Sequence, residues 1–259
     1  MSVRYGMPTL MEFNTIKQNL ELCKELGLDF LELNINMLYC TPDENVRTSL
    51  LKYKKEYGID FTMHYYDTVD VSSTSRYYRN YLYTAFSEIG KYLEGVVHKI
   101  VIHLEPGAFM TIHSKKNYVY STDNTYISRT LNTLKTIREV LYTFGISIVV
   151  ENVSIHPFME RIYKELHENG FMFCYDVGHN IIYNDGLFET YRQKYNFFIS
   201  HMHLHNVIGK HDHQQLALGD LDIPQLVEFA NQNDVDVVIE VKDSINLRKS
   251  VEYIRNLQK

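Results

Sequence analysis

Three histidines alternate with apolar residues in one short stretch of this sequence. The stretch spans residues 197–206 and reads FFISHMHLHN. Successive side chains on a β-strand point to opposite faces, so one face would carry His201, His203 and His205, and the other Met202 and Leu204. Packing gives no reason to align imidazoles, which are common ligands of divalent metal ions. We therefore interpret this stretch as a strand that supplies a metal ligand, with the other ligands on other strands.

The other strands that this hypothesis needs are present along the whole chain. Apolar, strand-like runs recur at residues 3–6, 28–33, 59–64, 98–103, 146–151, 171–176, 197–206 and 235–240. Helical spacings of apolar residues lie between and after them, most clearly over residues 124–144, and Asn14, Asp222 and Ser244 are the expected caps of three helices. Eight alternations predict one α/β domain, a single (β/α)8 TIM barrel over residues 1–259. The alternative, a doubly wound open sheet, is disfavoured because no G-x-G-x-x-G follows the first strand.

Ionisable side chains stand at the predicted ends of seven strands. These side chains are Glu32, His64, His103, Glu151, Asp176, His203 (with His205 beyond it) and Glu240. The carboxyl ends of barrel strands form the face where chemistry takes place. One polar strand end is common, but seven acidic or imidazole ends indicate a site. Two positions before three of these ends stand Val149, Cys174 and Val238, which would fill the barrel interior.

Four of these residues would provide metal ligands that are mostly oxygen atoms, with one nitrogen. They are Glu151, Asp176, His203 and Glu240. Such a set suits Mn, Mg or Co and tolerates Zn, so we predict a divalent metal cofactor. His179 follows Asp176 by three residues and either joins the site or lies in a surface loop. His201 would lie deeper in the barrel, and His205 would lie at the rim, close to substrate.

The motifs around these residues resemble those of the xylose-isomerase-like barrel superfamily, which contains sugar isomerases and epimerases and the endonuclease-IV-type apurinic endonucleases. The motifs are VVEN at 149–152, YDVGH at 175–179, HLHN at 203–206 followed by LGDLD at 218–222, and VIE at 238–240. They cover roughly the second half of the chain, and His64 and His103 extend the resemblance into the first half.

In the epimerase branch, the resemblance implies one metal held by the four-residue set, with Glu151 and Glu240 as the acid/base pair. A metal on a ketose carbonyl and its neighbouring hydroxyl acidifies the adjacent C–H, and a Glu on each side can move the proton. His179 would bind a substrate hydroxyl, and His205 and Glu32 are further predicted substrate contacts. We predict an isomerase or epimerase of a small sugar, sugar phosphate or related ketone. A lyase or dehydratase is an alternative, because proton abstraction beside a carbonyl also starts an elimination.

In the endonuclease branch, the resemblance implies three zinc ions. His64 and His103 would join Glu151 around one or two metals, and His179 would join an Asp-x-His pair on the third. As alternatives, His64 and His103 contact substrate or are structural. A metal-dependent phosphodiesterase is therefore the second hypothesis.

The loop expected to hold that Asp-x-His pair departs from the pattern. Counting back from Gly219 puts Gln215 where the His is expected and His213 where the Asp is expected. Asp212 with His211 or His213 would replace the pair only if the loop is reshaped.

The composition of the sequence limits which binding partners and which cellular compartment we expect. A formal net charge of -6 disfavours nucleic acid, because neutralising phosphates requires Lys and Arg. The three cysteines have no C-x-x-C spacing, which indicates a reducing compartment. The sequence has no N-terminal signal pattern and no apolar run of about 18 residues. We expect a cytoplasmic protein with a small-molecule substrate and no membrane contact; the sequence leaves homo-oligomerisation open.

Overall fold

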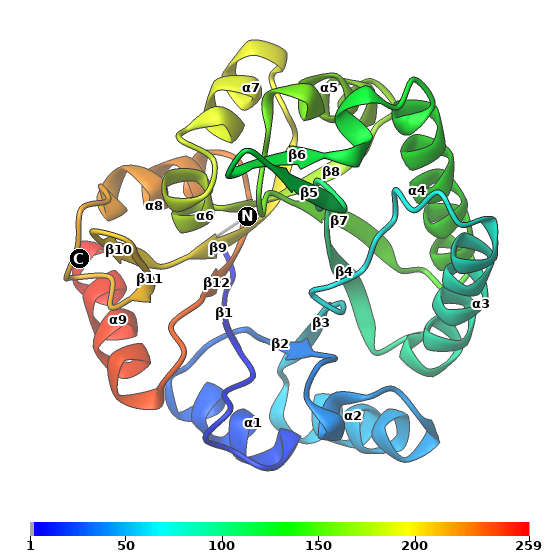
Figure 1. The fold of residues 1–259 in the computed structure, drawn as a ribbon. Coiled ribbons are helices and arrows are strands. Elements are labelled where there is room, and N and C mark those ends of the chain that lie inside the picture. The colour runs from blue at the N-terminus through cyan, green and yellow to red at the C-terminus, as the bar shows by residue number, and fades with distance from the viewer. Residues whose placement is uncertain (1–2, 259) are drawn as a thin grey trace.

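The computed structural model describes residues 3–258 and shows a closed barrel of eight strands (Figure 1). The strands follow one another around the barrel in the order β1, β12, β9, β8, β7, β4, β3, β2, and each adjacent pair is parallel. Their bounds are β1 (Tyr5–Pro8), β2 (Phe30–Asn34), β3 (Asp60–His64), β4 (Val97–His103), β7 (Ser147–Glu151), β8 (Met172–Asp176), β9 (Ile199–Leu204) and β12 (Asp236–Ile239). The predicted (β/α)8 barrel is confirmed.

Helices surround the barrel, as Figure 1 shows. They are α1 (Ile16–Glu25), α2 (Glu44–Tyr57), α3 (Arg76–Leu93), α4 (Tyr126–Tyr142), α5 (Glu160–Glu168), α6 (Val177–Ile182), α7 (Leu187–Tyr195), α8 (Ile223–Gln232) and α9 (Ser244–Leu257). Short 3-10 turns occur at Leu38–Cys40, Val119–Thr122 and Pro157–Met159. Among residues 3–258, no helix combines the length and apolar character that a membrane crossing requires.

Side-chain caps determine where several helices begin. Asp222 caps α8 as predicted, because its carboxylate accepts a backbone N–H of the first turn. The predicted caps Asn14 and Ser244 are wrong by one residue. Thr15 caps α1 and Asp243 caps α9, each accepting the N–H three residues ahead.

All eight barrel strands differ from their predicted bounds by one or two residues at one or both ends. β1 begins and ends two residues later than the predicted 3–6. β2 continues to Asn34, so Glu32 lies inside the strand rather than at its end. β9 ends at Leu204, which places His205 beyond the strand, because the chain turns there into a separate short strand.

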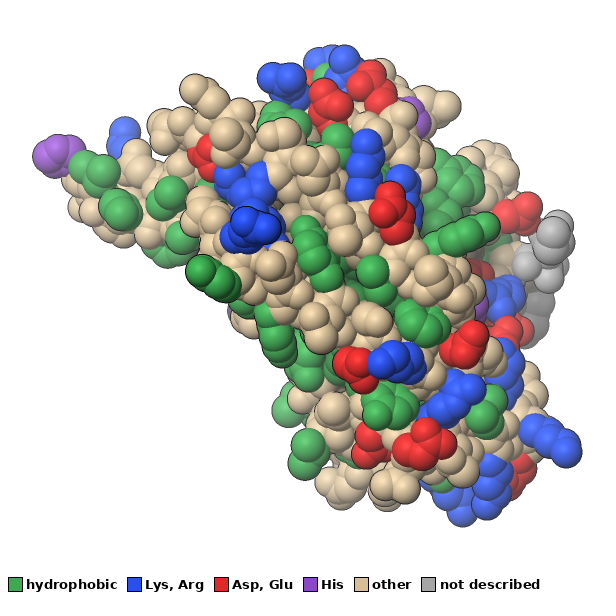
Figure 2. Space-filling view, turned by 90° about the vertical axis from the view of Figure 1, so that its right-hand side faces the viewer, with side chains coloured by type: hydrophobic (Ala, Val, Ile, Leu, Met, Phe, Trp, Pro, Cys, Tyr) green, Lys and Arg blue, Asp and Glu red, His purple; other side chains and the backbone are tan. Residues whose placement is uncertain are grey.

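Two hairpins lie outside the barrel and were not predicted. One pairs β10 (Asn206–Ile208) with β11 (His211–Gln214), and the other pairs β5 (Phe109–Ile112) with β6 (Lys115–Tyr118). Hairpin β5–β6 crosses in front of the barrel in Figure 1, and the side view in Figure 2 shows an arm with apolar side chains projecting from that face. Its residues are almost all exposed. Neither hairpin has the alternating apolar pattern of a half-buried strand, which is why periodicity missed them.

The apolar core has two parts. A large cluster fills the space between the strands and the helices. A small separate cluster of Val101, Val149 and Cys174 lies inside the barrel. Val149 and Cys174 therefore pack beneath the carboxyl ends of β7 and β8, as the alternation of side chains predicted.

Candidate metal centre at the barrel mouth

Four adjacent strands bring the predicted metal donors together. β7, β8, β9 and β12 end in or just before Glu151, Asp176, His203 and Glu240. The Nδ1 atom of His203 lies 3.3 Å from Glu151 Oε1, 3.4 Å from Glu240 Oε2 and 3.8 Å from Asp176 Oδ2. All four residues are buried, the most exposed being Glu240 at 7%. Three carboxylates and one imidazole nitrogen thus converge on one point.

This convergence fits a divalent cation. His203 Nε2 lies 2.9 Å from Glu32 Oε1 and donates its proton there, so a cation that displaced the proton from Nδ1 would meet a lone pair beside the carboxylates. Within residues 3–258, that Nδ1 atom, Glu240 Oε2 and the nearby His179 Nδ1 are buried and have no hydrogen-bond partner. Buried polar atoms without partners are unfavourable unless another group satisfies them. Burial lowers the pKa of His203, but the surrounding anions, including Glu240 and Glu151, outweigh it and raise that pKa, so the site favours a cation.

Glu32 lies beneath this centre rather than in it. Its carboxylate accepts hydrogen bonds from His201, His203 and the Thr62 hydroxyl. Burial would raise the pKa of Glu32, but His203 and His201 outweigh burial and lower it, so the group is an anion that orients both rings. Glu32 is 2% exposed and fully engaged, which makes it a support for His203. Glu32 also lines a cavity beside the metal donors, so its predicted contact with substrate stays a prediction.

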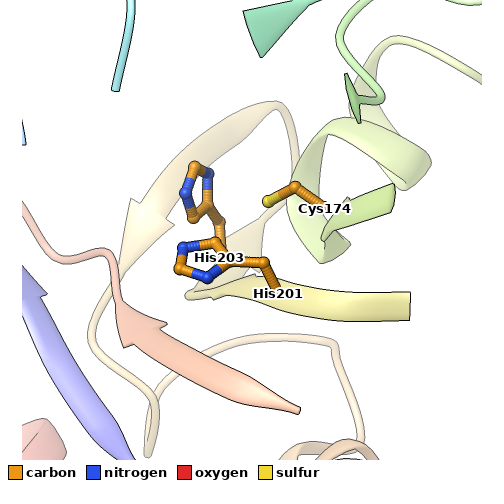
Figure 3. Close-up of side chains that lie close together, drawn as sticks. All are labelled: Cys174, His201 and His203. Atoms are coloured by element: carbon orange, nitrogen blue, oxygen red, sulfur yellow. The ribbon is translucent and has the colours of Figure 1, made fainter. Parts of the chain in front are cut away.

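Cys174 and His201 lie close to His203, as Figure 3 shows. Burial raises the pKa of the Cys174 thiol, so it is neutral and packs in the barrel interior. Burial also lowers the pKa of His201 to about 4, and its Nε2 atom is occupied by Glu32. This trio therefore lacks the thiolate that a metal would require, although its atoms lie close together.

His205 is a support for Asp176, and here the sequence prediction needs correction. Its Nδ1 accepts the backbone N–H of His213 at 2.8 Å, so the proton is on Nε2, which donates to Asp176 Oδ1 at 3.1 Å. His205 is 0% exposed, so it does not reach the rim or a substrate. Gly178 makes room for it, because a Cβ there would lie 2.0 Å from the His205 ring.

A second group of donor atoms meets at Oε2, the other carboxylate oxygen of Glu151. His64 and His103 each place Nδ1 against a backbone carbonyl, those of Tyr65 at 2.8 Å and Asp67 at 3.1 Å. Their Nε2 atoms lie 3.1 Å apart and 3.1 and 3.3 Å from Glu151 Oε2. Burial lowers the pKa of His103, but Glu151 outweighs burial and raises that pKa, so a positive charge is favoured where these three atoms meet. In neutral rings both Nε2 atoms would carry lone pairs that a metal ion could accept. This arrangement also fits a cation, and Glu151 would bridge it to the first centre.

A third group of donors includes residues of hairpin β10–β11. His179, Asp212 and His213 place ligand atoms within 4.8 Å of one another. His213 Nδ1 contacts the Glu240 carbonyl at 3.2 Å, which leaves Nε2 free. Burial lowers the pKa of His213 to about 4, so that lone pair is available. His211 is exposed, whereas Asp212 and His213 are partly buried, so the structure brings the latter two toward His179.

The sequence analysis missed two charged residues that line the site, Asp67 and Lys242. Lys242 Nζ lies 2.6 Å from Glu240 Oε1, although the Lys242 side chain remains 49% exposed. Burial raises the pKa of Glu240, but Lys242 and the neighbouring histidines outweigh it and lower that pKa. Its place two residues after Glu240 was the available signal, since both then point to the same side of an extended chain.

These side chains line a cleft of about 170 Å³ at the carboxyl end of the barrel. His64, His103, Glu151, His179, His213, Glu240 and Lys242 all contribute to it. Burial lowers the pKa of His179, but Asp176 and Glu151 outweigh it and raise that pKa to about 10. The cleft thus combines anionic oxygens, imidazoles and one ammonium group around a small space.

The family is decided by comparison with known proteins. Residues 20–257 match the family of xylose isomerase-like TIM barrels. The chain belongs to this family. No curated protein matches the sequence.

Solved structures of similar fold include several sugar epimerases. A D-tagatose 3-epimerase-like protein has a TM-score of 0.79 at 19% identity, covering 99% of this chain and 97% of that one. The 3-keto-D-glucoside 4-epimerase of E. coli has a TM-score of 0.75 at 18% identity, covering 98% and 99%. A probable 3-DHS dehydratase of Bacillus anthracis has a TM-score of 0.74 at 14% identity, also covering 98% and 99%. At these identities the likeness establishes the shared barrel.

Proposed function

We propose that this protein is a divalent-metal-dependent isomerase or epimerase acting on a small sugar or related ketone. The observation that carries the proposal is the approach of Glu151 and Glu240 to His203 Nδ1, at 3.3 and 3.4 Å, in the cleft at the barrel mouth. Glu151, Asp176, His203 and Glu240 would hold the metal. A bound divalent ion would polarise the substrate carbonyl and its neighbouring hydroxyl. The epimerases of similar fold are compatible with this assignment.

We infer that the two glutamates would act from different sides of the substrate. Between β7, which carries Glu151, and β12, which precedes Glu240, lie β8 and β9. A substrate in the cleft would therefore have one carboxylate on either side, so that one removes a proton and the other returns one. Lys242 holds Glu240 through Oε1, and Oε2 faces the cleft without a partner. Glu240 is thus a fixed anion with one free acceptor atom.

Solvent exchange at the reacting carbon tests this proposal. Purified protein with one divalent metal per chain, incubated with a panel of ketoses in D2O, is expected to incorporate deuterium beside the carbonyl. Glu240→Gln and Glu151→Gln are each expected to reduce that rate about 100-fold or more, the range for general acid–base groups. Glu252→Gln, on the exposed face of α9, is the matched control. Undiminished exchange in Glu240→Gln would rule out the acid/base assignment. Product analysis separates epimerisation from elimination, which releases water.

A second candidate function is favoured by the additional donor groups. Hydrolysis of a phosphodiester uses several divalent ions that bind the phosphate and activate water. His64 and His103 around Glu151 Oε2, and His179 with Asp212 and His213, provide donors that a one-metal isomerase does not need. His213 has a left-handed backbone with φ of 53°, and its proximity to His179 and Asp212 supports this hypothesis.

The number of bound metals separates the two candidates. Elemental analysis after saturation and desalting is expected to give one ion per chain for the isomerase. Three ions per chain, reduced by His103→Gln and by His213→Gln separately, would instead support the phosphodiesterase. Cleavage of bis(p-nitrophenyl) phosphate by the three-metal form would then complete that assignment.

A further inference from the structure

A larger cavity adjoins the metal-donor cleft. It has a volume of about 420 Å³, within the range of pockets that bind drug-sized ligands. Five residues line both spaces, namely Asn34, His64, Asp67, Glu240 and Lys242. A molecule whose reacting part lies between His64 and Glu240 can therefore extend into this second cavity.

The far side of this cavity is apolar. Pro8, Met11 and Met37 line it, with Pro8 at the end of β1 and Met37 after β2. Met11 is 88% exposed, so it packs against little of the protein itself. Met side chains adapt to irregular apolar surfaces and make favourable contacts with aromatic rings. Two such side chains beside one cavity form a surface that suits an apolar ring.

A free monosaccharide would use this surface poorly, because hydroxyl groups cover most of its faces. The charged cleft of about 170 Å³ already provides the donors for a sugar or phosphate group. We propose that the substrate has two parts, a polar reacting group in the metal cleft and a ring-sized apolar substituent against Met11 and Met37. This inference rests on the proposed function for the reacting end and adds the class of substituent at the other end.

Paired probes that differ only in the substituent test the inference. Phenyl phosphate and methyl phosphate offer the same oxygen donors, and only the first carries an apolar ring. The metal-loaded protein is expected to bind phenyl phosphate at least 10-fold more tightly, measured by calorimetry. The double variant Met11→Ala/Met37→Ala is expected to lose most of this preference while its affinity for methyl phosphate stays the same. Leu38→Ala, which removes an equally exposed side chain (89%) outside the cavity lining, is the control.

Methyl signals of the methionines in the metal-loaded protein report directly on the apolar end of the probe. With ¹³C-methyl methionine, phenyl phosphate is expected to shift the Met11 and Met37 signals, and methyl phosphate is not. Equal affinities for the two probes, or a preference that survives the double variant, would overturn the inference. A separate metal titration reports on the proposed function, so failure of the metal centre and failure of the apolar subsite give different results.

Discussion

At the scale of single residues, the role of each histidine is set by the partner of its second nitrogen. His203 donates a hydrogen bond from Nε2 to Glu32 and turns Nδ1 toward the carboxylates, whereas His205 donates from Nε2 to Asp176. Both lie in the row of imidazoles that indicated a metal site. The row was visible in the sequence, but the tautomers were not. They depend on atoms far away in the chain, such as the His213 backbone N–H on His205.

The support that His205 gives to Asp176 leads to a prediction about metal affinity. In His205→Gln the amide would not maintain both hydrogen bonds of the ring at the same distances. Loss of such a support typically weakens metal binding about 10- to 100-fold. We expect a decrease of that size in Zn²⁺ or Mn²⁺ affinity by calorimetry, with an unchanged far-UV circular dichroism spectrum. His113→Asn, at an exposed left-handed position that Asn tolerates, is the control. Wild-type affinity in His205→Gln would contradict the assigned role.

At the scale of elements, the barrel was predictable and the hairpins were not. Apolar runs and helical spacings determine the eight strands and their helices, because the strands are buried on both faces and the helices bury one face. Hairpin β10–β11 instead depends on local antiparallel pairing with an irregular register between Asn206 and Ile208. Counting back from Gly219 therefore failed to identify the partners of His179. The structure offers the adjacent pair Asp212 and His213.

The contact between α6 and the chain after β9 leads to a second prediction. An Ala replacing Gly inside a helix normally stabilises it by about 1 kcal/mol. At Gly178 the added Cβ would lie 2.0 Å from a His205 ring that is fully buried and held at both nitrogens. We expect Gly178→Ala to lower the free energy of unfolding by about 2 kcal/mol, as overpacking does. Urea denaturation measures this change.

A double-mutant cycle tests the cause of that destabilisation. In a His205→Ala background the ring is absent, so Gly178→Ala is expected to have almost no effect or to stabilise α6. A coupling of this kind identifies direct contact between the two sites. If Gly178→Ala destabilised both backgrounds equally, the clash with His205 would not be the reason.

At the scale of the whole molecule, the two ends of the barrel have different tasks. Near the carboxyl end, buried polar atoms such as Glu240 Oε2 have no hydrogen-bond partner among the described residues. At the opposite end, the charged groups of Arg4, Lys99 and Asp236 are paired with one another. Asp236, at the start of β12, accepts hydrogen bonds from Arg4 Nε and Nη2 and from Lys99 Nζ, all at 2.9 Å. Lys99 Nζ also donates to the Ser200 carbonyl at 2.7 Å. These contacts join β4, β9 and β12 with the residue before β1, and thus help to close the barrel.

This network predicts how stability depends on pH. Burial raises the pKa of Asp236, but the nearby His98, the hydrogen bonds from Arg4 and the charge of Lys99 outweigh it and lower that pKa. A carboxyl group with a lowered pKa in the folded state stabilises the fold fully above its unfolded pKa of about 4, and this contribution is lost as the pH falls. Asp236→Asn is therefore expected to reduce the free energy of unfolding by about 2 kcal/mol at pH 7, typical of hydrogen bonds to a charged group.

Between pH 5 and 8 the difference between the wild type and Asp236→Asn should stay constant, because the carboxyl group is ionised in both the folded and the unfolded state. Below about pH 4 the unfolded wild type takes up a proton that the folded state resists, so the difference should shrink. Denaturant titrations at several pH values measure it, with exposed Glu252→Gln as the control. A difference independent of pH down to 3 would mean that Asp236 acts through its shape rather than its charge.

Because the network lies at the end of the barrel away from the metal donors, metal binding by Asp236→Asn should match the wild type at pH 7.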